Sequence, residues 1–324
     1  MRLVTVDEVR AAARRIDGVA VRTPLLACPW AGRPERSLRL KPENLQPVGA
    51  FKVRGAWNAL AMLPEARRAA GVVAYSSGNH AQAVAYAARA GGVPATIVID
   101  DTAPALKIAA TKELGAEVVL APPAQRAAVA RALAQERGAT LIPPYDHPDV
   151  IAGQGTAGLE IAEDLPDVAS VLVPISGGGL ASGVAVAIKA LCPSAVVYGV
   201  EPELAADTRD SFAAGELVRW PSEDRARTSA DGLRAEPSEL TFAHLRALLD
   251  GVLTVTEAQI RHTVGLLAAR SRIVAEPSGA VAPAAYLHLT ESLPPGPCVA
   301  VVSGGNIDPT LFVDILCEHM DTRA

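Results

Sequence analysis

The chain has 324 residues, half of them hydrophobic, so it can form one large domain or two modest ones with a substantial core. Its net charge of −5 and its lack of a basic stripe argue against a nucleic-acid partner. No apolar run reaches the roughly 20 residues of a membrane helix, which argues against a membrane protein.

The first predicted element is a helix that begins after Thr5. Thr5 and Glu8 have capping-box spacing, and an apolar stripe is supplied by Val6, Val9, Ala13 and Ile16. After this helix, short apolar runs alternate with longer amphipathic segments. This alternation is typical of an α/β protein in which crossover helices join parallel strands.

The strands expected in chain order are residues 38–41, 72–76, 95–99, 117–120, 139–142, 170–173, 196–200 and 299–303. The helices expected between them are residues 55–62, 81–89, 105–114, 125–136, 155–163, 180–191, 257–270 and 308–319. The charged stretch 216–239 is expected to be a surface excursion. Two sheets with a cleft between them would bring the loops at their carboxyl ends together.

Lys52 lies in the run FKVRGA (51–56), at the start of a predicted helix. The helix dipole disfavours a cation at that end, and this placement lowers the pKa of an amine. A lysine with a lowered pKa suits covalent catalysis through a Schiff base. The alternative is a surface lysine whose stem packs on apolar neighbours.

Three loops with small and polar residues follow Lys52 at long intervals: SSGNH (76–80), SGGG (176–179) and SGGN (303–306). Backbone N–H groups at a helix N-terminus bind phosphate or carboxylate, and glycines let these donors approach closely. An amine and such loops together suit a phosphorylated aldehyde cofactor. Taken singly, each loop also fits an ordinary capped turn.

Two further patterns are weaker. The G-x-G-x-x-G run at 153–158 does not follow a predicted strand, so we interpret it as no dinucleotide site. Glu201, the carbonyl of Ala205 and Asp207 offer oxygen ligands of the kind that Mg²⁺ or Ca²⁺ takes. On spacing alone, a solvated acidic surface is favoured for these three residues.

Together the motifs resemble the serine racemase/threonine dehydratase family of pyridoxal-phosphate enzymes, which has fold type II and is tryptophan synthase β-like. The resemblance covers nearly the whole chain and rests on ordered runs: KPENLQP (41–47), FKVRGA (51–56), SSGNHAQ (76–82), AGQGT (152–156), GGGL (177–180), EPSGA (276–280) and VSGGN (302–306). It implies two open, twisted, mostly parallel sheet domains with the cofactor in the cleft between them. Residues 1–69 and 148–324 would form the large cofactor-binding domain, and residues 70–147 the small mobile domain.

The resemblance also implies roles for matched residues. Lys52 would hold pyridoxal phosphate covalently and later move the Cα proton. The cofactor would contact Phe51, Lys52, Asn79, Gly177, Gly178, Gly179, Leu180 and Ser303. The substrate carboxylate would lie among Ser76, Ser77, Gly78 and His80, and Glu201, Ala205 and Asp207 match the family's divalent-metal site. A homodimer is expected from the family, and feedback by isoleucine is not, because the chain stops soon after the last motif.

Three positions refine the comparison. Ser77 stands where many threonine dehydratases carry alanine, and in racemase-like members this serine is the acid/base opposite the lysine. Ala50 replaces the usual serine before Phe51, and Ser176 replaces the first glycine of a usual four-glycine loop. Arg126 lies near an arginine that racemase-like members place close to the substrate, where it would favour a second carboxylate.

We therefore predict an ammonia-lyase that converts serine, threonine or 3-hydroxyaspartate to a 2-oxo acid and ammonia. Ser303 would lie opposite the ring nitrogen, and a hydroxyl cannot keep that nitrogen protonated as a carboxylate would. The ring is then a weaker electron sink, which favours elimination because prompt loss of the β-group relieves the carbanion. One alternative is a serine or aspartate racemase that uses Lys52 and Ser77 on opposite faces of the substrate. Another is a catalytically silent protein that binds an amino acid or the cofactor.

The N-terminus and the cysteines favour a cytoplasmic location. Residues 1–5 lack the apolar stretch of a signal peptide. The four cysteines, Cys28, Cys192, Cys298 and Cys317, form no C-x-x-C pair, so we expect reduced and mostly buried thiols.

Overall fold

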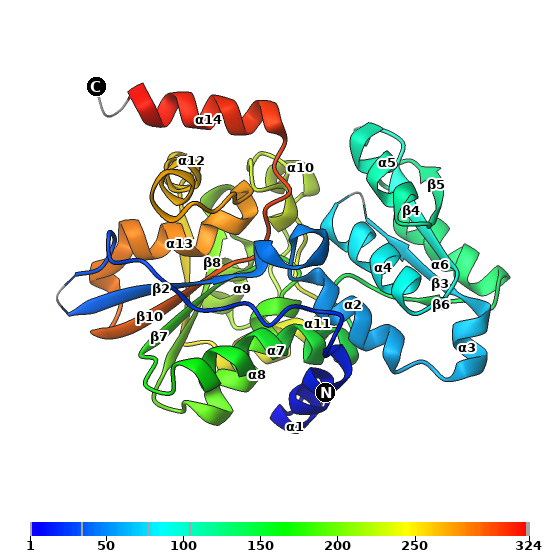
Figure 1. The fold of residues 1–324 in the computed structure, drawn as a ribbon, viewed down its shortest axis with the longest axis horizontal. Coiled ribbons are helices and arrows are strands. Elements are labelled where there is room, and N and C mark those ends of the chain that lie inside the picture. The colour runs from blue at the N-terminus through cyan, green and yellow to red at the C-terminus, as the bar shows by residue number, and fades with distance from the viewer. Residues whose placement is uncertain (1, 34, 77, 104, 322–324) are drawn as a thin grey trace.

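Two sheets organise the chain in a computed structural model that describes residues 2–33, 35–76, 78–103 and 105–321 (Figure 1). The larger has strand order β1-β2-β10-β7-β8-β9: Leu26–Ala27, Arg36–Pro42, Gly296–Val302, Ser170–Pro174, Val196–Pro202 and Gly251–Val255. The smaller has order β5-β4-β3-β6: Glu117–Ala121, Ala95–Asp100, Val72–Tyr75 and Thr140–Leu141. Only β1 pairs antiparallel among the described strands. The predicted α/β class with mostly parallel sheets is confirmed.

Helices connect and cover the strands. The α-helices are α1 Val6–Ile16, α2 Lys52–Ala61, α3 Glu65–Ala70, α4 Asn79–Ala90, α5 Ala105–Glu113, α6 Arg126–Glu136, α7 Pro148–Asp164, α8 Gly179–Leu191, α9 Asp207–Ala214, α10 Ser222–Arg225, α11 Glu239–Leu248, α12 Glu257–Leu266, α13 Pro277–Leu289 and α14 Pro309–Asp321. Short 3₁₀ turns are η1 Glu43–Leu45, η2 Pro47–Gly49, η3 Glu203–Ala205, η4 Asp231–Leu233 and η6 Thr290–Ser292. In Figure 1 the helices α4, α5 and α6 lie with the smaller sheet on the right.

The prediction missed several elements, each for a local reason. Strand β1 has two residues and helix α10 has four, which is too short for a periodic signal. Helix α13 is buried along its first ten residues and alanine-rich, so it shows no polar face. The expected helix 257–270 ends as an α-helix at Leu266, because η5 (Leu267–Ser271) continues it as a π-helix.

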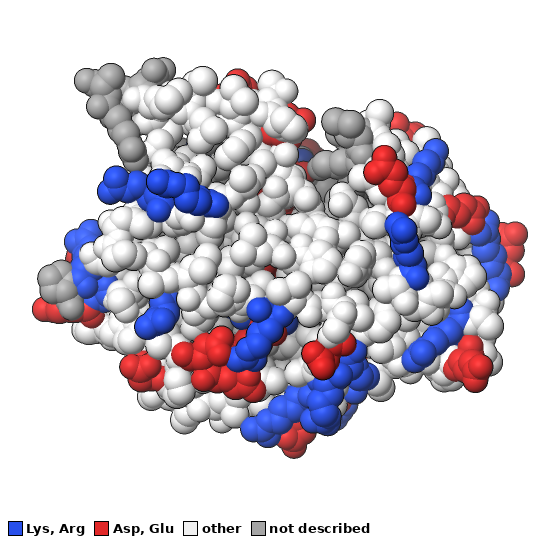
Figure 2. Space-filling view, in the orientation of Figure 1, with Lys and Arg blue, Asp and Glu red and all other residues white. Residues whose placement is uncertain are grey.

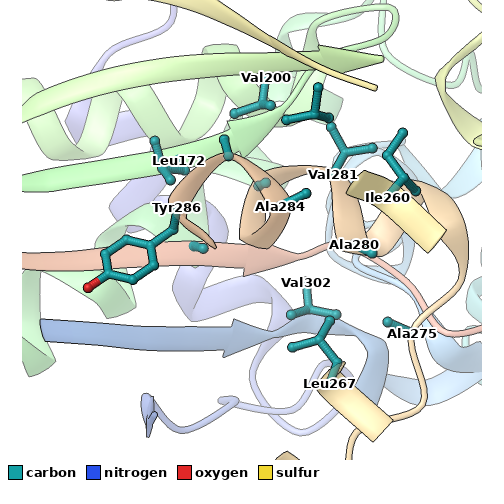
Figure 3. Packing of buried hydrophobic residues seen from close by; sticks show 14 of the residues in the cluster. Leu172, Val200, Ile260, Leu267, Ala275, Ala280, Val281, Ala284, Tyr286 and Val302 are labelled. Atoms are coloured by element: carbon teal, nitrogen blue, oxygen red, sulfur yellow. The ribbon is translucent and has the colours of Figure 1, made fainter. Parts of the chain in front are cut away.

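Helix α13 packs across the larger sheet and fills much of its core (Figure 3). Val281 and Ala284 on this helix lie near Leu172 of β7 and Val200 of β8. All four side chains are fully buried. Burial of this apolar surface keeps the strands of the larger sheet in place, and the loops at their carboxyl ends with them.

A buried ionic cluster joins α2 to the large sheet and to α7. The Arg54 guanidinium donates to both carboxylate oxygens of Glu43 at 2.7 and 2.8 Å and to those of Glu160 at 2.6 and 2.8 Å. Lys41 on β2 donates to the same Glu160 at 2.5 Å. The cluster holds the first turn of α2, which carries Lys52, because Arg54 lies in that turn.

The surface and the helices give two further observations. No helix in the described part of the chain combines the length and apolarity needed to cross a bilayer. Basic and acidic side chains alternate on the face drawn in Figure 2, and the described residues form no continuous basic band on that face.

Candidate active site

The carboxyl ends of strands from both sheets line one cavity of about 410 Å³. Ser76 follows β3 of the smaller sheet, and Ser176 and Ser303 follow β7 and β10 of the larger sheet. Convergence at the carboxyl ends is usual for sites in open α/β sheets. The cavity therefore brings together all three of the small-residue loops identified in the sequence.

Lys52 is the first residue of α2 and points its amine into this cavity. Its Nζ donates to the carbonyl oxygen of Pro144 at 2.7 Å and lies 5.0 Å from the centre of the Phe51 ring. Burial lowers the pKa of the amine from 10.5 to about 8. Near neutral pH the neutral fraction of this amine is therefore much larger than that of an exposed lysine, which favours it as a nucleophile and base.

The glycine loop 177–179 leads into α8, which begins at Gly179. Gly178 has a left-handed φ of 86°, which glycine adopts without strain, and no side chain caps the helix. A Cβ at Gly177 would fall 2.2 Å from the Tyr145 ring, so only glycine fits beneath that ring. The uncapped N-terminus of α8 therefore offers N–H groups to an anion in the cavity.

The second loop opens α4 in the same way. Ser76, Gly78, Asn79 and His80 all line the cavity, and the Ser76 hydroxyl accepts a bond from the Gly78 N–H at 3.1 Å. Ser77, the expected acid/base, lies outside the described residues. No described side chain caps α4 either, so its first N–H groups suit a carboxylate.

His80 is neutral at physiological pH. Burial, aided by the nearby Lys52 charge, lowers the pKa of its imidazole to about 3. Its Nε2 lies 2.9 Å from the carbonyl oxygen of Ile142, which only accepts, so Nε2 carries the hydrogen. This bond fixes the orientation of the ring, and the imidazole exchanges no proton near pH 7.

Asn79 belongs to a chain of polar side chains along the cavity wall. Its Nδ2 donates to Glu276 at 2.7 Å, and its Oδ1 accepts from Asn306 Nδ2 at 2.8 Å. Asn306 also donates to the carbonyl oxygen of Val48 at 2.8 Å. These bonds connect α4, the loop after β10 and the turn that precedes Lys52.

The two serines at the strand ends have different partners. Ser303 is buried, and its hydroxyl donates to the carbonyl oxygen of Ser278 at 3.3 Å. Ser176, the departure from a four-glycine loop, accepts from the Ala235 N–H at 3.0 Å and donates to the Ala235 carbonyl oxygen at 3.2 Å. These two hydrogen bonds of Ser176 hold the segment around Ala235 beside the glycine loop.

Arg126 also lines the cavity, although it lies in the smaller sheet's half of the molecule. It is the first residue of α6, and its Nη1 donates to Asp100 Oδ2 at 2.5 Å. Its side chain is 28% exposed, so Arg126 both lines the open cavity and contacts Asp100.

Glu201, Ala205 and Asp207 lie apart from this cavity: Glu201 is near the end of β8, Ala205 ends the turn η3, and Asp207 begins α9. Both carboxylates are buried, and burial raises the pKa of Glu201 to about 8 and that of Asp207 to about 6. Glu201 accepts from the N–H groups of Thr208 and Arg209 at 3.1 and 2.8 Å. Asp207 Oδ2 has no hydrogen-bond partner within the described ranges.

The sequence missed several residues of the cavity wall. Tyr145 lies outside the motifs, and Glu276, although it opens the matched run EPSGA (276–280), was given no role in the site. Residues 231–235, which line the cavity, come from the stretch 216–239 that was expected to be a surface excursion. That expectation was wrong for this part, because η4 packs its Leu233 into the core beside α13.

The cavity fits pyridoxal phosphate. Lys52 supplies an amine with a lowered pKa, and the loop 177–179 leaves room and N–H donors for a phosphate. Phe51, Asn79 and Ser303 line the same cavity. The buried carboxylates of Glu201 and Asp207 fit a divalent cation in ligand chemistry, although the described residues hold no group of three or more metal-ligating side chains.

Comparisons with known proteins agree with this geometry. The model of the family described as "Pyridoxal-phosphate dependent enzyme" matches residues 16–304. The chain is 41% identical to an L-threo-3-hydroxyaspartate ammonia-lyase from Pseudomonas sp over 320 residues, 98% of this chain and 99% of the relative.

Two solved structures are similar over almost the whole chain. A threonine deaminase from T.th. has a TM-score of 0.88 and 44% identity, covering 94% of this chain and 99% of the other. Maize serine racemase has a TM-score of 0.91 and 37% identity, covering 99% of each chain. With its lysine, its glycine loop and these matches, the chain belongs to the family of pyridoxal-phosphate-dependent enzymes.

Proposed function

We propose that the chain is an ammonia-lyase that converts 3-hydroxyaspartate to oxaloacetate and ammonia, and that also accepts serine or threonine. The presence of Arg126 in the same cavity as Lys52 carries this proposal. Arginine binds carboxylates well, and 3-hydroxyaspartate has a second carboxylate where serine and threonine have none. The similar ammonia-lyase from Pseudomonas sp supports the same substrate.

Lys52 would take the Cα proton of the substrate. Its pKa of about 8 leaves part of the amine unprotonated at neutral pH, and the carbonyl of Pro144 can accept one of its hydrogens. Pyridoxal phosphate, held by Lys52 and the loop 177–179, would supply the electron sink that makes this proton acidic. The β-hydroxyl would take up one proton and leave as water, which balances the Cα proton that Lys52 removes, and hydrolysis of the product enamine would release ammonia and the 2-oxo acid.

The α-carboxylate of the substrate would bind at the start of α4. The N–H groups there follow Gly78, and His80 remains neutral with its Nε2–H bonded to the Ile142 carbonyl oxygen, so the ring brings no charge to this place. An anion at a helix N-terminus is stabilised by both the N–H groups and the dipole. This arrangement would orient the Cα proton toward Lys52.

Release of 2-oxo acid from 3-hydroxyaspartate, serine and threonine tests the proposal. We expect kcat/KM to be highest for 3-hydroxyaspartate, and Arg126→Ala to raise KM for that substrate far more than for serine. Lys52→Ala would abolish release from all three. Equal KM increases for serine and 3-hydroxyaspartate in Arg126→Ala would contradict the role of Arg126.

Racemisation is a second candidate, because Ser77 directly follows Ser76, which lines the cavity, and because maize serine racemase is similar. Lys52 and Ser77 would then exchange protons on opposite faces of Cα. D-serine and pyruvate formed from L-serine separate the two activities. Ser77→Ala should abolish D-serine formation and spare part of the pyruvate; loss of both in equal measure would refute this division of labour.

A divalent cation, Mg²⁺ or Ca²⁺, is proposed between Glu201, the Ala205 carbonyl and Asp207. Two buried carboxylates with raised pKa values and an oxygen without a described partner support it. A cation would remove the desolvation penalty that raises both pKa values. Chelation that changes neither activity nor melting temperature would eliminate the site.

The molecular organisation is proposed as follows. Residues 70–147 form a small mobile domain, supported by a sheet built only from strands within 72–141; residues 1–69 and 148–324 form the large domain. The chain assembles as a homodimer, which is supported by four exposed hydrophobic side chains, Leu45, Val274, Val313 and Met320. It acts in the cytoplasm, which is supported by its free cysteines. A light-scattering mass of one 33.5 kDa chain would contradict the dimer.

A further inference from the structure

Asp100 forms an ion pair with Arg126 at the edge of the cavity. Asp100 ends β4, Arg126 begins α6, and the Oδ2 and Nη1 atoms lie 2.5 Å apart. Arg126 lines the cavity, whereas Asp100 is not among the described residues that line it. A substrate in the cavity would therefore touch Arg126 and not Asp100.

The position of the Arg126 guanidinium at the cavity wall is not fixed by its own backbone. Its side chain has several rotatable bonds, and its position at the start of α6 is unfavourable for a cation because of the helix dipole. The Asp100 side chain is only 15% exposed and comes from a central strand of the smaller sheet. It supplies a fixed negative charge and a fixed acceptor at the place where the guanidinium lies.

We propose that Asp100 is a positioning residue that sets the preference for substrates with a second carboxylate, by holding the Arg126 guanidinium at the cavity wall. The inference rests on the proposed function, since Arg126 acts there as the carboxylate-binding group. A guanidinium has five N–H donors, so Arg126 can bind a substrate carboxylate while it keeps its bond to Asp100. A held guanidinium loses less side-chain freedom when the substrate binds.

Two variants of Asp100 separate its hydrogen bond from its charge. Asp100→Ala removes both, and we expect it to raise KM for 3-hydroxyaspartate by about tenfold with little change in kcat, because misplacement weakens binding more than chemistry. Asp100→Asn keeps an acceptor oxygen, and we expect its KM to stay within about threefold of the wild type. KM for serine should change in neither variant, since serine has no second carboxylate.

A control and a double variant show whether Asp100 acts through Arg126. Glu117→Ala removes the ion pair with Arg137 at the far end of α6, and it should leave both KM values unchanged. In an Arg126→Ala background, Asp100→Ala should have no further effect on either substrate. A further loss in that background would overturn the proposal.

Binding of unreactive acids supplies a readout that needs no turnover. Calorimetric titration of the holoenzyme with succinate and propionate should show that Asp100→Ala weakens succinate binding alone. Tighter binding of 3-hydroxyaspartate or succinate in Asp100→Ala would show competition instead of positioning and would refute the proposal, as would an equal change for serine. If the wild type releases no 2-oxo acid, the proposed function fails, and the succinate titration still tests the position that Asp100 gives Arg126.

Discussion

At the residue scale, the chemistry of this chain depends on groups whose burial changes their protonation. In the described structure the Lys52 amine contacts the Pro144 carbonyl oxygen and the Phe51 ring, and it forms no ion pair with a carboxylate. Desolvation without a compensating charge is what lowers its pKa. The same effect acts with the opposite sign on Glu201 and Asp207, whose protonated forms are favoured.

Lys52 should therefore capture its cofactor at a lower pH than an exposed lysine does. Because only the neutral amine attacks an aldehyde, the rate at which cofactor-free protein forms a borohydride-trapped adduct should rise with pH and level off above about 8. Mass spectrometry from pH 6 to 11 measures it. Lys52→Ala should give no adduct at this cavity, and Lys112→Ala is the surface control; a midpoint near 10.5 would contradict the lowered pKa.

The carboxylates of Glu201 and Asp207 make a cation effect pH-dependent. Their folded-state pKa values, about 8 and about 6, exceed the ordinary 4.5 and 3.8, so the folded state binds more protons and its free energy of unfolding falls as pH rises through this window. A bound cation removes that loss. We expect Mg²⁺ or Ca²⁺ to raise the melting temperature more at pH 8 than at pH 5.

The variant Glu201→Gln, combined with Asp207→Asn, is the control for this cation effect. The amides lack the negative charge that attracts the ion, so the double variant should show no cation-dependent shift at either pH. An equal shift at pH 5 and pH 8 in the wild type would exclude the proposed ligands.

Sequence motifs predicted only part of the site. Lys52 and the loop 177–179 were predictable because a lysine at a helix start and a glycine turn before a helix have local patterns. Tyr145 was not, and Glu276 was matched in the run 276–280 without a role in the site, since the place of both in the cavity depends on contacts with segments far away in the sequence. Asp231 lies in a stretch without any periodicity, and only tertiary packing brings it to the cavity.

At the element scale, glycines decide how closely the central helices approach. The run 153–158, which resembled a dinucleotide fingerprint, lies inside α7 and faces α2 and α8. A Cβ at Gly155 would fall 2.8 Å from the Gly183 carbonyl oxygen, and one at Gly158 would fall 2.7 Å from that of Val184. These glycines therefore serve helix packing, and α7 in turn supports the helix that carries Lys52.

Gly183→Ala should destabilise the fold. The new Cβ would fall 2.3 Å from the Ile151 carbonyl oxygen and 2.5 Å from the Gly155 nitrogen, and backbone atoms cannot rotate away. We expect a loss of about 2–4 kcal/mol in the free energy of unfolding, measured by urea denaturation. Gly32→Ala is the control, because its nearest atom would be 3.7 Å away; similar effects of both substitutions would refute the packing argument.

At the scale of the whole molecule, the Arg54 cluster ties sheet, helices and site together. The side chains of Arg54 and Glu43 have no exposed surface. Burial alone would lower the pKa of Arg54, but the neighbouring carboxylates of Glu43 and Glu160 raise it. Burial would likewise raise the pKa of Glu43, but the Arg54 guanidinium helps to lower it. Buried ions of this kind are stable only while each keeps its partner. The cluster therefore requires β2, η1, α2 and α7 to assemble together.

Arg54→Met should lower the free energy of unfolding by about 3–5 kcal/mol, because Glu43 would remain fully buried without its ion-pair partner and Glu160 would keep only Lys41. Arg22→Met is the matched control, since Arg22 forms half-exposed ion pairs with Glu163 and Asp164 and should contribute about 1 kcal/mol or less. Chemical denaturation measures both. A loss for Arg54→Met no larger than that for Arg22→Met would show that the cluster does not stabilise the fold.

The sequence by itself determined the α/β class, the order of most strands and helices, and the lysine and glycine motifs of a pyridoxal-phosphate enzyme. Periodicity and turn chemistry are local properties, so they can be recognised within about ten to twenty residues. Only the tertiary structure decided that Lys52, Arg126, Gly177 and Glu276 share one cavity, and that Asp100 pairs with Arg126 at its edge. The physical reason is that long-range packing sets the distances between distant segments, and burial in that packing sets the protonation of their side chains.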